Sequence, residues 1–269
     1  MKPYLLFRVD NENREEYEVA KDIWGDRLTR FRSEIPEDTL VIGRYSCLPF
    51  YKDLEDELHN KGSRLINSHQ DHLFIAEMDW YHWLEGLTPR TWFDVGYATV
   101  PDAEHGWVVK GRTNSRKFKW STHMYAPNRE ALRDVMTRLW DDTFIGEQGL
   151  VVREYIPLRK LEEGINGMPV TNEWRCFFLG TELLSAGYYW SQAECAEDMT
   201  DFPKEAEELA REAASKLASE VPAFVVDVGE TEEGGWTIIE INDFQMSGLS
   251  LNDPSLFYQK LKAHFESRR

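Results

Sequence analysis

The segment FVVDVGETEEGGWTIIEIND, residues 224–243, constrains the fold most strongly, because two apolar runs flank a turn rich in glutamate and glycine. This pattern predicts two strands joined as a hairpin. Asp227 lies inside the first run, and Glu240 and Asn242 lie near the end of the second. Because Asp and Asn are poor strand formers, their presence in such apolar strands indicates that their side chains have a role.

These three polar residues can meet on one face of the hairpin. Side chains alternate between the two faces of a strand, so Glu240 and Asn242 point the same way, and Asp227 joins them if the segments pair. Carboxylate and amide oxygens suit Mg²⁺, a hard cation whose remaining coordination positions are commonly filled by water and phosphate oxygens. We expect a metal site here, and a polar strand face turned toward solvent is the alternative.

A basic run, WVVKGRTNSRKFKW, begins at Trp107. It places Lys110 at the end of an expected strand and Lys117 and Lys119 beyond a polar loop. The run is not a Walker loop, because no Gly-Lys-Ser/Thr sequence is present. Lysines on a strand and a loop can nevertheless bind phosphates as point charges. Solvated loop charge is the alternative.

Arg175 lies in the expected strand NEWRCFF, between Trp174 and Phe177. An unpaired guanidinium in such surroundings would be costly. Its partner is therefore either a carboxylate, Glu173 or Glu154, or the phosphate of a ligand. The sequence leaves both possibilities open.

The first third of the chain alternates between strand and helix patterns, which predicts a small, mostly parallel sheet. Strands are expected over residues 3–9, 39–46 and 63–68, and helices over 14–28, 51–62 and 76–87. A boundary is expected near Pro89. Beyond it the pattern predicts antiparallel strands over 106–112, 149–157, 172–180 and 182–190, and helices over 128–142, 203–220 and from about 254.

The balance of charges excludes one class of partner. With 31 basic and 48 acidic residues the formal net charge is −17, and a field of that sign repels duplex nucleic acid. The three cysteines form no C-x-x-C pair and are expected to be reduced thiols. The acidic start does not fit a signal peptide, and no apolar run is long enough for a membrane span. We therefore expect a cytoplasmic protein.

The order of these motifs is strand lysine, loop lysines, helix, REYI, EWRCF and finally D-x(12)-E-x-N. That order resembles the ATP-grasp superfamily, in particular the clade defined by one arginine and two lysines. It is also similar to the eukaryotic cell-division-cycle proteins that assemble a translation initiation factor. The resemblance implies an α+β fold in which two lobes clasp ATP, preceded by a small α/β pre-ATP-grasp domain. The expected division is 1–90 for that domain, 91–152 for the first lobe and 153–269 for the second.

The resemblance also implies roles for single residues. ATP would contact Lys110, Arg112, Lys117 and the main chain of Arg153, Glu154 and Tyr155. Catalysis would involve Arg175 and Lys119, although which of Arg112, Lys117 and Lys119 is the second phosphate ligand stays open. Mg²⁺ would be held by Asp227, Glu240 and Asn242. Substrate contacts would come from Asp243, Gln245 and Ser247, which directly follow the metal strand.

The implied activity is that of a carboxylate–amine ligase. Such an enzyme uses ATP and Mg²⁺ to form an acyl phosphate, joins it to an amine as an amide, and releases ADP and phosphate. Its substrates would be small molecules or peptides that carry the carboxylate and the amine, with a protein partner as a further possibility. The alternatives are an ATP-binding assembly factor without turnover and, less favoured, a phosphotransferase. His69 and His72 are expected to be structural or solvated rather than metal ligands.

Overall fold

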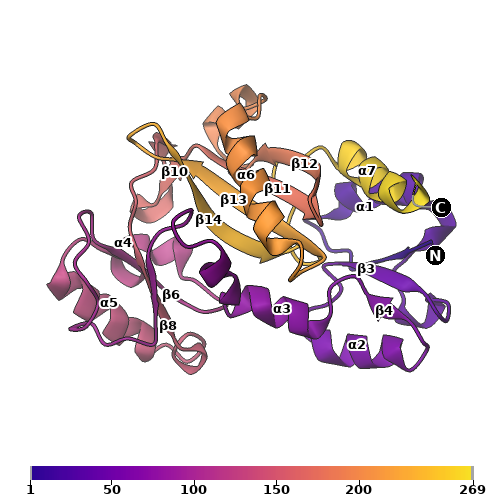
Figure 1. Ribbon diagram of the computed structural model, residues 1–269, viewed down its shortest axis with the longest axis horizontal. Helices are drawn as coiled ribbons and strands as arrows, with labels where there is room; N and C mark the ends of the chain where they lie inside the picture. Colours follow the sequence, from indigo (N-terminus) through magenta and orange to yellow (C-terminus); the bar gives the residue numbers. More distant parts are fainter. Residues whose placement is uncertain (1, 268–269) are drawn as a thin grey trace.

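The computed structural model describes residues 2–267. It opens with a four-stranded parallel sheet in the order β2-β1-β3-β4, which confirms the small parallel sheet expected in the first third (Figure 1). The strands are β1 (Tyr4–Phe7), β2 (Leu28–Thr29), β3 (Leu40–Arg44) and β4 (Arg64–Leu65). The helix expected over residues 14–28 ends at Trp24, and the two-residue β2 begins at Leu28, the last residue of that expected range.

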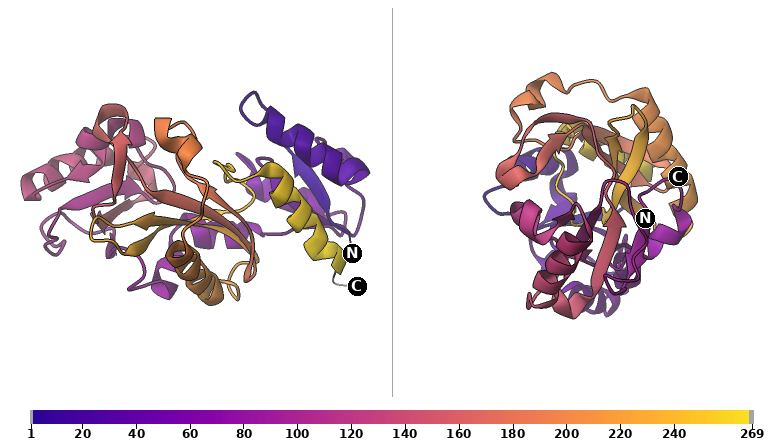
Figure 2. Two further views of the ribbon diagram at one scale, coloured as in Figure 1. Left: turned by 90° about the horizontal axis from the view of Figure 1, so that it is seen from above. Right: turned by 90° about the vertical axis from the view of Figure 1, so that its left-hand side faces the viewer.

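Helices from both ends of the chain cover this sheet. They are α1 (Arg14–Trp24), α2 (Tyr51–His59) and the last helix, α7 (Pro254–Ser267). Helix α3 (His69–Ala76) follows β4 and packs instead against the strand β14 (Trp236–Asp243). Figure 2 shows α7 lying beside α1 at the amino-terminal end of the molecule. Leu5 and Phe7 of β1 share one buried cluster with Phe257 and Tyr258 of α7. This packing joins α7 to the amino-terminal sheet.

The helix expected over residues 76–87 is wrong. The observed helix α3 ends at Ala76, and residues 79–83 form only a 3-10 helix. The start of α3 is set by a capping box, in which the amide of Asp71 donates to the Ser68 hydroxyl at 3.1 Å and the amide of Ser68 donates to the Asp71 carboxylate at 2.7 Å. This local signal sets the start of α3 at His69. Met78, whose φ of 63° is left-handed, separates α3 from the 3-10 helix that follows.

The middle of the chain forms an antiparallel sheet in the order β5-β8-β6-β7. Its strands are β5 (Thr91–Phe93), β6 (Trp107–Gly111), β7 (Tyr125–Ala126) and β8 (Leu150–Glu154). The short helix α4 (Trp120–His123) precedes β7, and α5 (Arg129–Trp140) packs on the sheet. The predicted N-cap of α5 is confirmed, since the Asn128 side chain accepts a hydrogen bond from the amide of Ala131 at 3.0 Å.

The largest sheet is antiparallel and has the order β12-β11-β13-β14. Its strands are β11 (Glu173–Leu179), β12 (Glu182–Tyr188), β13 (Ala223–Glu230) and β14 (Trp236–Asp243), and α6 (Lys204–Leu217) packs across it (Figure 1). A separate hairpin joins β9 (Lys160–Glu163) to β10 (Pro169–Thr171). The predicted hairpin of β13 and β14 is confirmed, with Asp227 directly opposite Glu240.

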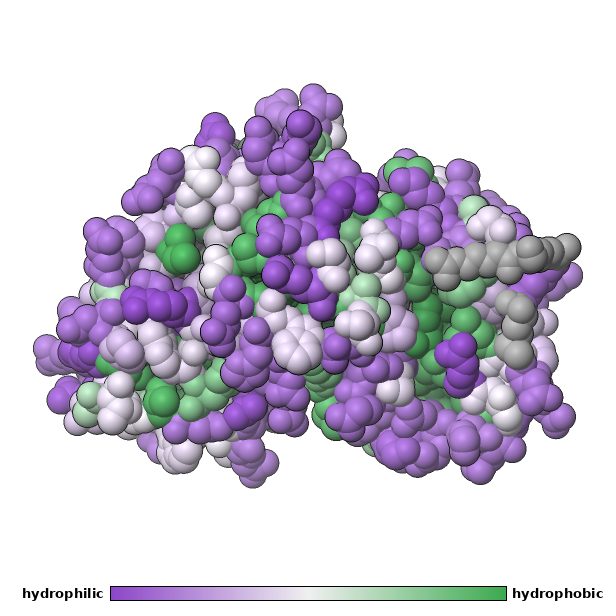
Figure 3. Space-filling model, viewed as in Figure 1, coloured by the Kyte–Doolittle hydropathy of each residue, from purple (hydrophilic) through white to green (hydrophobic). Residues whose placement is uncertain are grey.

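The two antiparallel sheets meet where β8 approaches β14. There the guanidinium of Arg153 donates to the carbonyl of Ile239 at 2.6 Å. On the face viewed in Figure 1, hydrophilic side chains cover most of the surface (Figure 3). Within residues 2–267 no helix has both the length and the apolar character needed to cross a membrane.

Candidate active site

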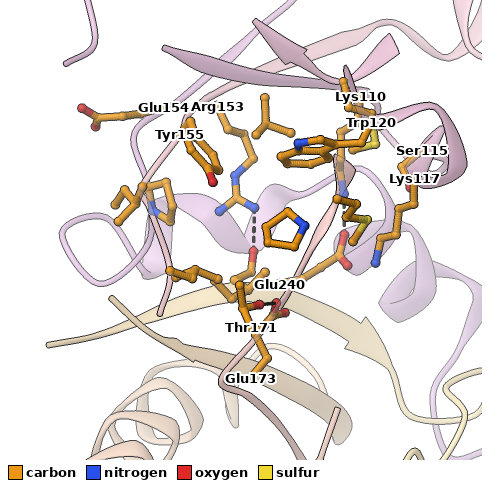
Figure 4. A pocket seen from close by; sticks show the side chains of 18 of the residues that line it. Lys110, Ser115, Lys117, Trp120, Arg153, Glu154, Tyr155, Thr171, Glu173 and Glu240 are labelled. Atoms are coloured by element: carbon orange, nitrogen blue, oxygen red, sulfur yellow. Dashed lines mark hydrogen bonds and ion pairs between the residues drawn. The ribbon is translucent and has the colours of Figure 1, made fainter. Parts of the chain in front are cut away.

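A first cavity of about 160 Å³ lies between the β5–β8 sheet and the β11–β14 sheet (Figure 4). Apolar and aromatic side chains form most of its wall, namely Val108, Trp120, Met124, Tyr155, Leu158, Met168, Trp190 and Ile239. The polar side chains include Lys110, Lys117, Glu173 and Glu240. A mostly apolar cavity with a few convergent charges is typical of a small-molecule site.

Lys110 and Glu240 form an ion pair across this cavity, from β6 to β14 (Figure 4). Their side chains are 12% and 27% exposed. Burial alone would raise the pKa of Glu240, but the charges of Lys110 and Lys117 outweigh it and lower that pKa to about 2. Glu240 is therefore ionised, and the positive charges of two lysines stabilise its carboxylate.

Lys117 points into the first cavity from the short 3-10 helix over residues 117–119 (Figure 4). Its ammonium donates to the Tyr189 hydroxyl at 2.9 Å. Burial lowers the pKa of Lys117, but Tyr189 and Glu240 reverse that effect and leave it raised. The lysine is thus a fixed cation beside Glu240.

Lys119, which the resemblance implied to be catalytic, lies apart from the groups described so far. Lys119 is exposed and lines neither this cavity nor the second one described below. With three residues per turn, positions two apart in a 3-10 helix point in different directions, so the side chains of Lys117 and Lys119 leave this helix on different sides. Arg112 pairs with Asp94 at 2.5 Å and lines the second cavity rather than the first.

Arg175 is paired with Asp227, which is neither of the carboxylates considered from the sequence. Two parallel hydrogen bonds of 2.9 and 2.8 Å join the guanidinium to the carboxylate. Burial lowers the pKa of Arg175, but Asp227 outweighs it and the pKa is raised. Glu173 instead accepts from Trp190, and Glu154 pairs with Arg90.

The three predicted metal ligands are brought together. Asp227 lies opposite Glu240, and the side-chain amide of Asn242 donates to Asp227 at 2.9 Å. No three His, Cys, Asp or Glu side chains among residues 2–267 form a metal-binding group, so this set depends on the amide oxygen of Asn242. Two carboxylates and one amide oxygen fit Mg²⁺ in donor type, and Arg175 and Lys110 balance the two carboxylates here.

The expected hinge, Arg153–Tyr155, borders the first cavity but uses its own main chain for the sheet. The amides of Glu154 and Tyr155 donate to the carbonyls of Arg90 and Gly106 at 2.8 and 2.9 Å. The next residue, Ile156, also lines the cavity, and its amide makes no hydrogen bond to the rest of the described chain. The site residues expected from the sequence stop at Tyr155, although Ile156 ends the REYI motif and precedes a proline that marks the end of the strand.

The side chain of Arg153 has a structural role. Its guanidinium is buried and donates to the hydroxyls of Thr88 and Thr91 at 2.7 and 3.2 Å, in addition to the Ile239 carbonyl. Burial lowers the pKa of Arg153. The residue joins β8 to the neighbouring sheet beneath the cavity.

A second cavity of about 480 Å³ adjoins the first, because Lys110 and Glu240 line both. Arg175 and Asn242 also line it, together with Asp243 and Ser247 from the predicted substrate segment. The remaining residue of that segment, Gln245, does not line it. Gln245 is fully buried, and its side chain accepts from the amide of Gly43 at 2.9 Å, which ties β3 to the end of β14.

The structure places His72 beside the predicted substrate segment, whereas the sequence indicated only a structural or solvated histidine. Its Nδ1 lies 3.0 Å from the carboxylate of Asp243, its ring stacks on Tyr51 with centroids 4.7 Å apart, and it lines the second cavity. Asp243 is buried and also accepts from the amide of Gln245. The carboxylate therefore orients the imidazole, as in many acid–base sites.

The two adjoining cavities are lined by lysines, carboxylates and an arginine. Comparison with known proteins identifies the class of protein that has this arrangement. The chain belongs to the ATP-grasp superfamily: the family model described as ATP-grasp domain, R2K clade family 3, matches residues 100–261. The fold class expected from the resemblance is confirmed. No curated protein matches the chain.

Solved structures agree along the whole length of the chain. The RimK domain protein ATP-grasp from Sphaerobacter thermophilus DSM 20745 is 16% identical, with a TM-score of 0.59 over 96% of this chain and 98% of its own. D-cycloserine synthetase DcsG is 14% identical, with a TM-score of 0.62 over 97% and 99%. ATP-grasp ligase PsnB, complexed with a phosphomimetic variant of its minimal precursor, Mg and ADP, is 10% identical, with a TM-score of 0.58 over 98% and 99%. At these identities the likeness shows the fold.

Proposed function

We propose that the protein is an ADP-forming ligase that joins a carboxylate to an amine as an amide. The observation that carries this proposal is the junction of the two cavities at Lys110 and Glu240. A phosphate group bound there would lie at the boundary between a nucleotide and a second substrate. The ligases among the solved structures of like fold support the proposal.

The first cavity would take ATP. Its apolar wall suits adenine, and the amide of Ile156 offers a hydrogen-bond donor at the hinge. Lys110 and Lys117 would bind the phosphates at the end that adjoins the second cavity. These roles fit the proposed membership of the clade defined by one arginine and two lysines, with Lys117 as the second lysine and Arg175 as the arginine.

Mg²⁺ would be held by Asp227, Glu240 and Asn242, and it would neutralise phosphate charge during transfer. Arg175 and Lys110 are the present partners of the two carboxylates. When the carboxylates bind a cation, both side chains become available to phosphate oxygens. The ion pairs thus keep oppositely charged groups ordered at the site before the ligands bind.

The second cavity would hold the substrate carboxylate beside Arg175. A carboxylate oxygen forms a bond to the γ-phosphorus while the bond from that phosphorus to ADP breaks, which gives an acyl phosphate. An amine nitrogen then bonds to the acyl carbon, and phosphate leaves with the electron pair of the broken C–O bond. His72, oriented by Asp243, accepts the proton that the amine loses.

The alternative of an ATP-binding assembly factor needs the first cavity only. The ligase is favoured because His72 and Asp243 form an acid–base pair in the second cavity, which nucleotide docking alone does not require. The similarity to the cell-division-cycle assembly proteins, the domain division at residues 90 and 152, and the cytoplasmic location remain parts of the proposal.

Trapping the acyl phosphate tests the reaction. Purified protein with ATP and Mg²⁺ is screened against amino acids, short peptides and dicarboxylates with hydroxylamine present, and ADP and hydroxamate are measured. A ligase gives both products only when its carboxylate is supplied, and no AMP. ATP binding without carboxylate-stimulated ADP release across the panel, together with retention of a protein partner in pull-downs from the native cell, would favour the assembly factor.

A further inference from the structure

A third cavity of about 330 Å³ lies in the amino-terminal domain, at the carboxyl ends of its parallel strands. It is lined by the residues that end or follow β1, β2 and β3. In the strand order β2-β1-β3-β4, the connection after β1 leads toward one edge of the sheet and the connection after β3 leads toward the other. Crevices outside the carboxyl ends of parallel strands, at such a reversal of strand order, are the general ligand sites of open α/β sheets.

The charges of this cavity are of one sign. Arg8, Arg30 and Arg32 line it, and none of its lining residues is acidic. Among residues 2–267, only Arg32 of the three lies within 4 Å of a carboxylate, that of Glu57 at 3.3 Å. Arg8 donates to the carbonyl of Leu48 at 2.9 Å. In a chain of net charge −17, three arginines around one cavity form a local reversal of sign.

The third cavity adjoins the second, because Leu48 lines both. Leu48 is 48% exposed, and the neighbouring Phe31, which also lines the third cavity, is 59% exposed. A ligand that begins beside Arg175 and His72 can therefore extend past an apolar side chain to the three arginines. Such a ligand would extend from the proposed reaction centre into the third cavity, which is basic and partly apolar.

From these observations we infer that the substrate is an acidic peptide whose carboxylates bind in the third cavity while its reacting group lies in the second. This inference rests on the proposed ligase function. The planar fork of arginine matches a carboxylate with two parallel hydrogen bonds, and Phe31 and Leu48 offer apolar surface to the aliphatic parts of the peptide. The three arginines select substrates by charge and take no part in phosphate transfer.

Binding of fluorescein-labelled tetraglutamate to the full-length protein, measured by anisotropy without nucleotide at low salt, tests the inference. The double variant Arg8→Gln/Arg30→Gln should bind the peptide about tenfold more weakly than the wild type, and added salt should weaken wild-type binding. The matched control is Arg133→Gln/Arg138→Gln, which removes the same charge from the exposed side of α5 and should bind like the wild type. Circular dichroism checks that both variants are folded.

The inference would be overturned by no wild-type binding at millimolar peptide, by equal weakening in both double variants, or by equal binding of labelled tetraglutamine. Tighter binding of inorganic phosphate than of tetraglutamate would also overturn it, in favour of a phosphate site. Binding of ATP and Mg²⁺ to the wild type is measured in parallel. Loss of peptide binding alone refutes the acidic substrate, whereas loss of nucleotide binding alone refutes the proposed function.

Discussion

Replacing Glu240 by glutamine should destabilise the ligand-free protein in a pH-dependent way. The pKa of Glu240 is lowered from 4.5 to about 2, which corresponds to about 3 kcal/mol at roughly 1.4 kcal/mol per pH unit. Because the pKa is lowered on folding, this stabilisation is present above pH 4.5 and is lost as the pH falls toward 2. A loss of about 3 kcal/mol in the free energy of unfolding is of the size expected when a buried ion pair loses one partner. Here Lys110 is left without its counter-charge.

Urea unfolding followed by tryptophan fluorescence measures this effect. Wild type and Glu240→Gln should differ by about 3 kcal/mol at pH 7, and by less than half of that at pH 3. The matched control is Glu207→Gln, which removes one partner of the exposed Glu207–Arg211 pair of α6 and should cost about 0.5 kcal/mol or less. A Glu240→Gln variant as stable as the wild type at pH 7, or a difference that persists on acidification, would refute the coupling of Glu240 to the lysines.

Three further variants test the roles of single side chains. Lys117→Met should raise the Kd for ATP with Mg²⁺ about tenfold, equivalent to about 1.4 kcal/mol, whereas Lys119→Met should bind like the wild type; equal effects in calorimetry would contradict the assignment. Arg175→Lys should lose about 1–2 kcal/mol of stability with most of the turnover, because lysine cannot form two parallel hydrogen bonds to Asp227; full activity would exclude a role for the guanidinium. His72→Gln should lower kcat with an amine acceptor about 100-fold while the Kd for ATP stays unchanged, and an unchanged kcat would exclude His72 as the base.

The hairpin of β13 and β14 could be predicted because its signals are local. Two apolar runs, a glycine-containing turn and acidic residues in unfavourable strand positions together specify the pairing and the shared face. The observed register places Asp227 opposite Glu240, as the pattern requires. The start of α5 could be predicted from a local signal as well, because Asn128 caps its first turn.

The pairing of charges could not be predicted, because it depends on how separate strands meet. The partner of Arg175 lies 52 residues further along, on the neighbouring strand β13. His72 approaches Asp243 across 171 residues, from a helix whose capping box the sequence reasoning had overlooked. Gln245 follows β14, yet its side chain contacts β3, since a turn after a strand does not keep the strand's alternation.

The most direct test of the proposed site is a crystal structure with a non-hydrolysable ATP analogue and Mg²⁺. We expect adenine in the first cavity beside Ile156, phosphates at Lys110 and Lys117, and the metal among Asp227, Glu240 and Asn242. We also expect the Arg175–Asp227 and Lys110–Glu240 pairs to be altered by the ligands. A nucleotide bound elsewhere, or an empty first cavity with both ion pairs intact at saturating ligand, would contradict the proposed function.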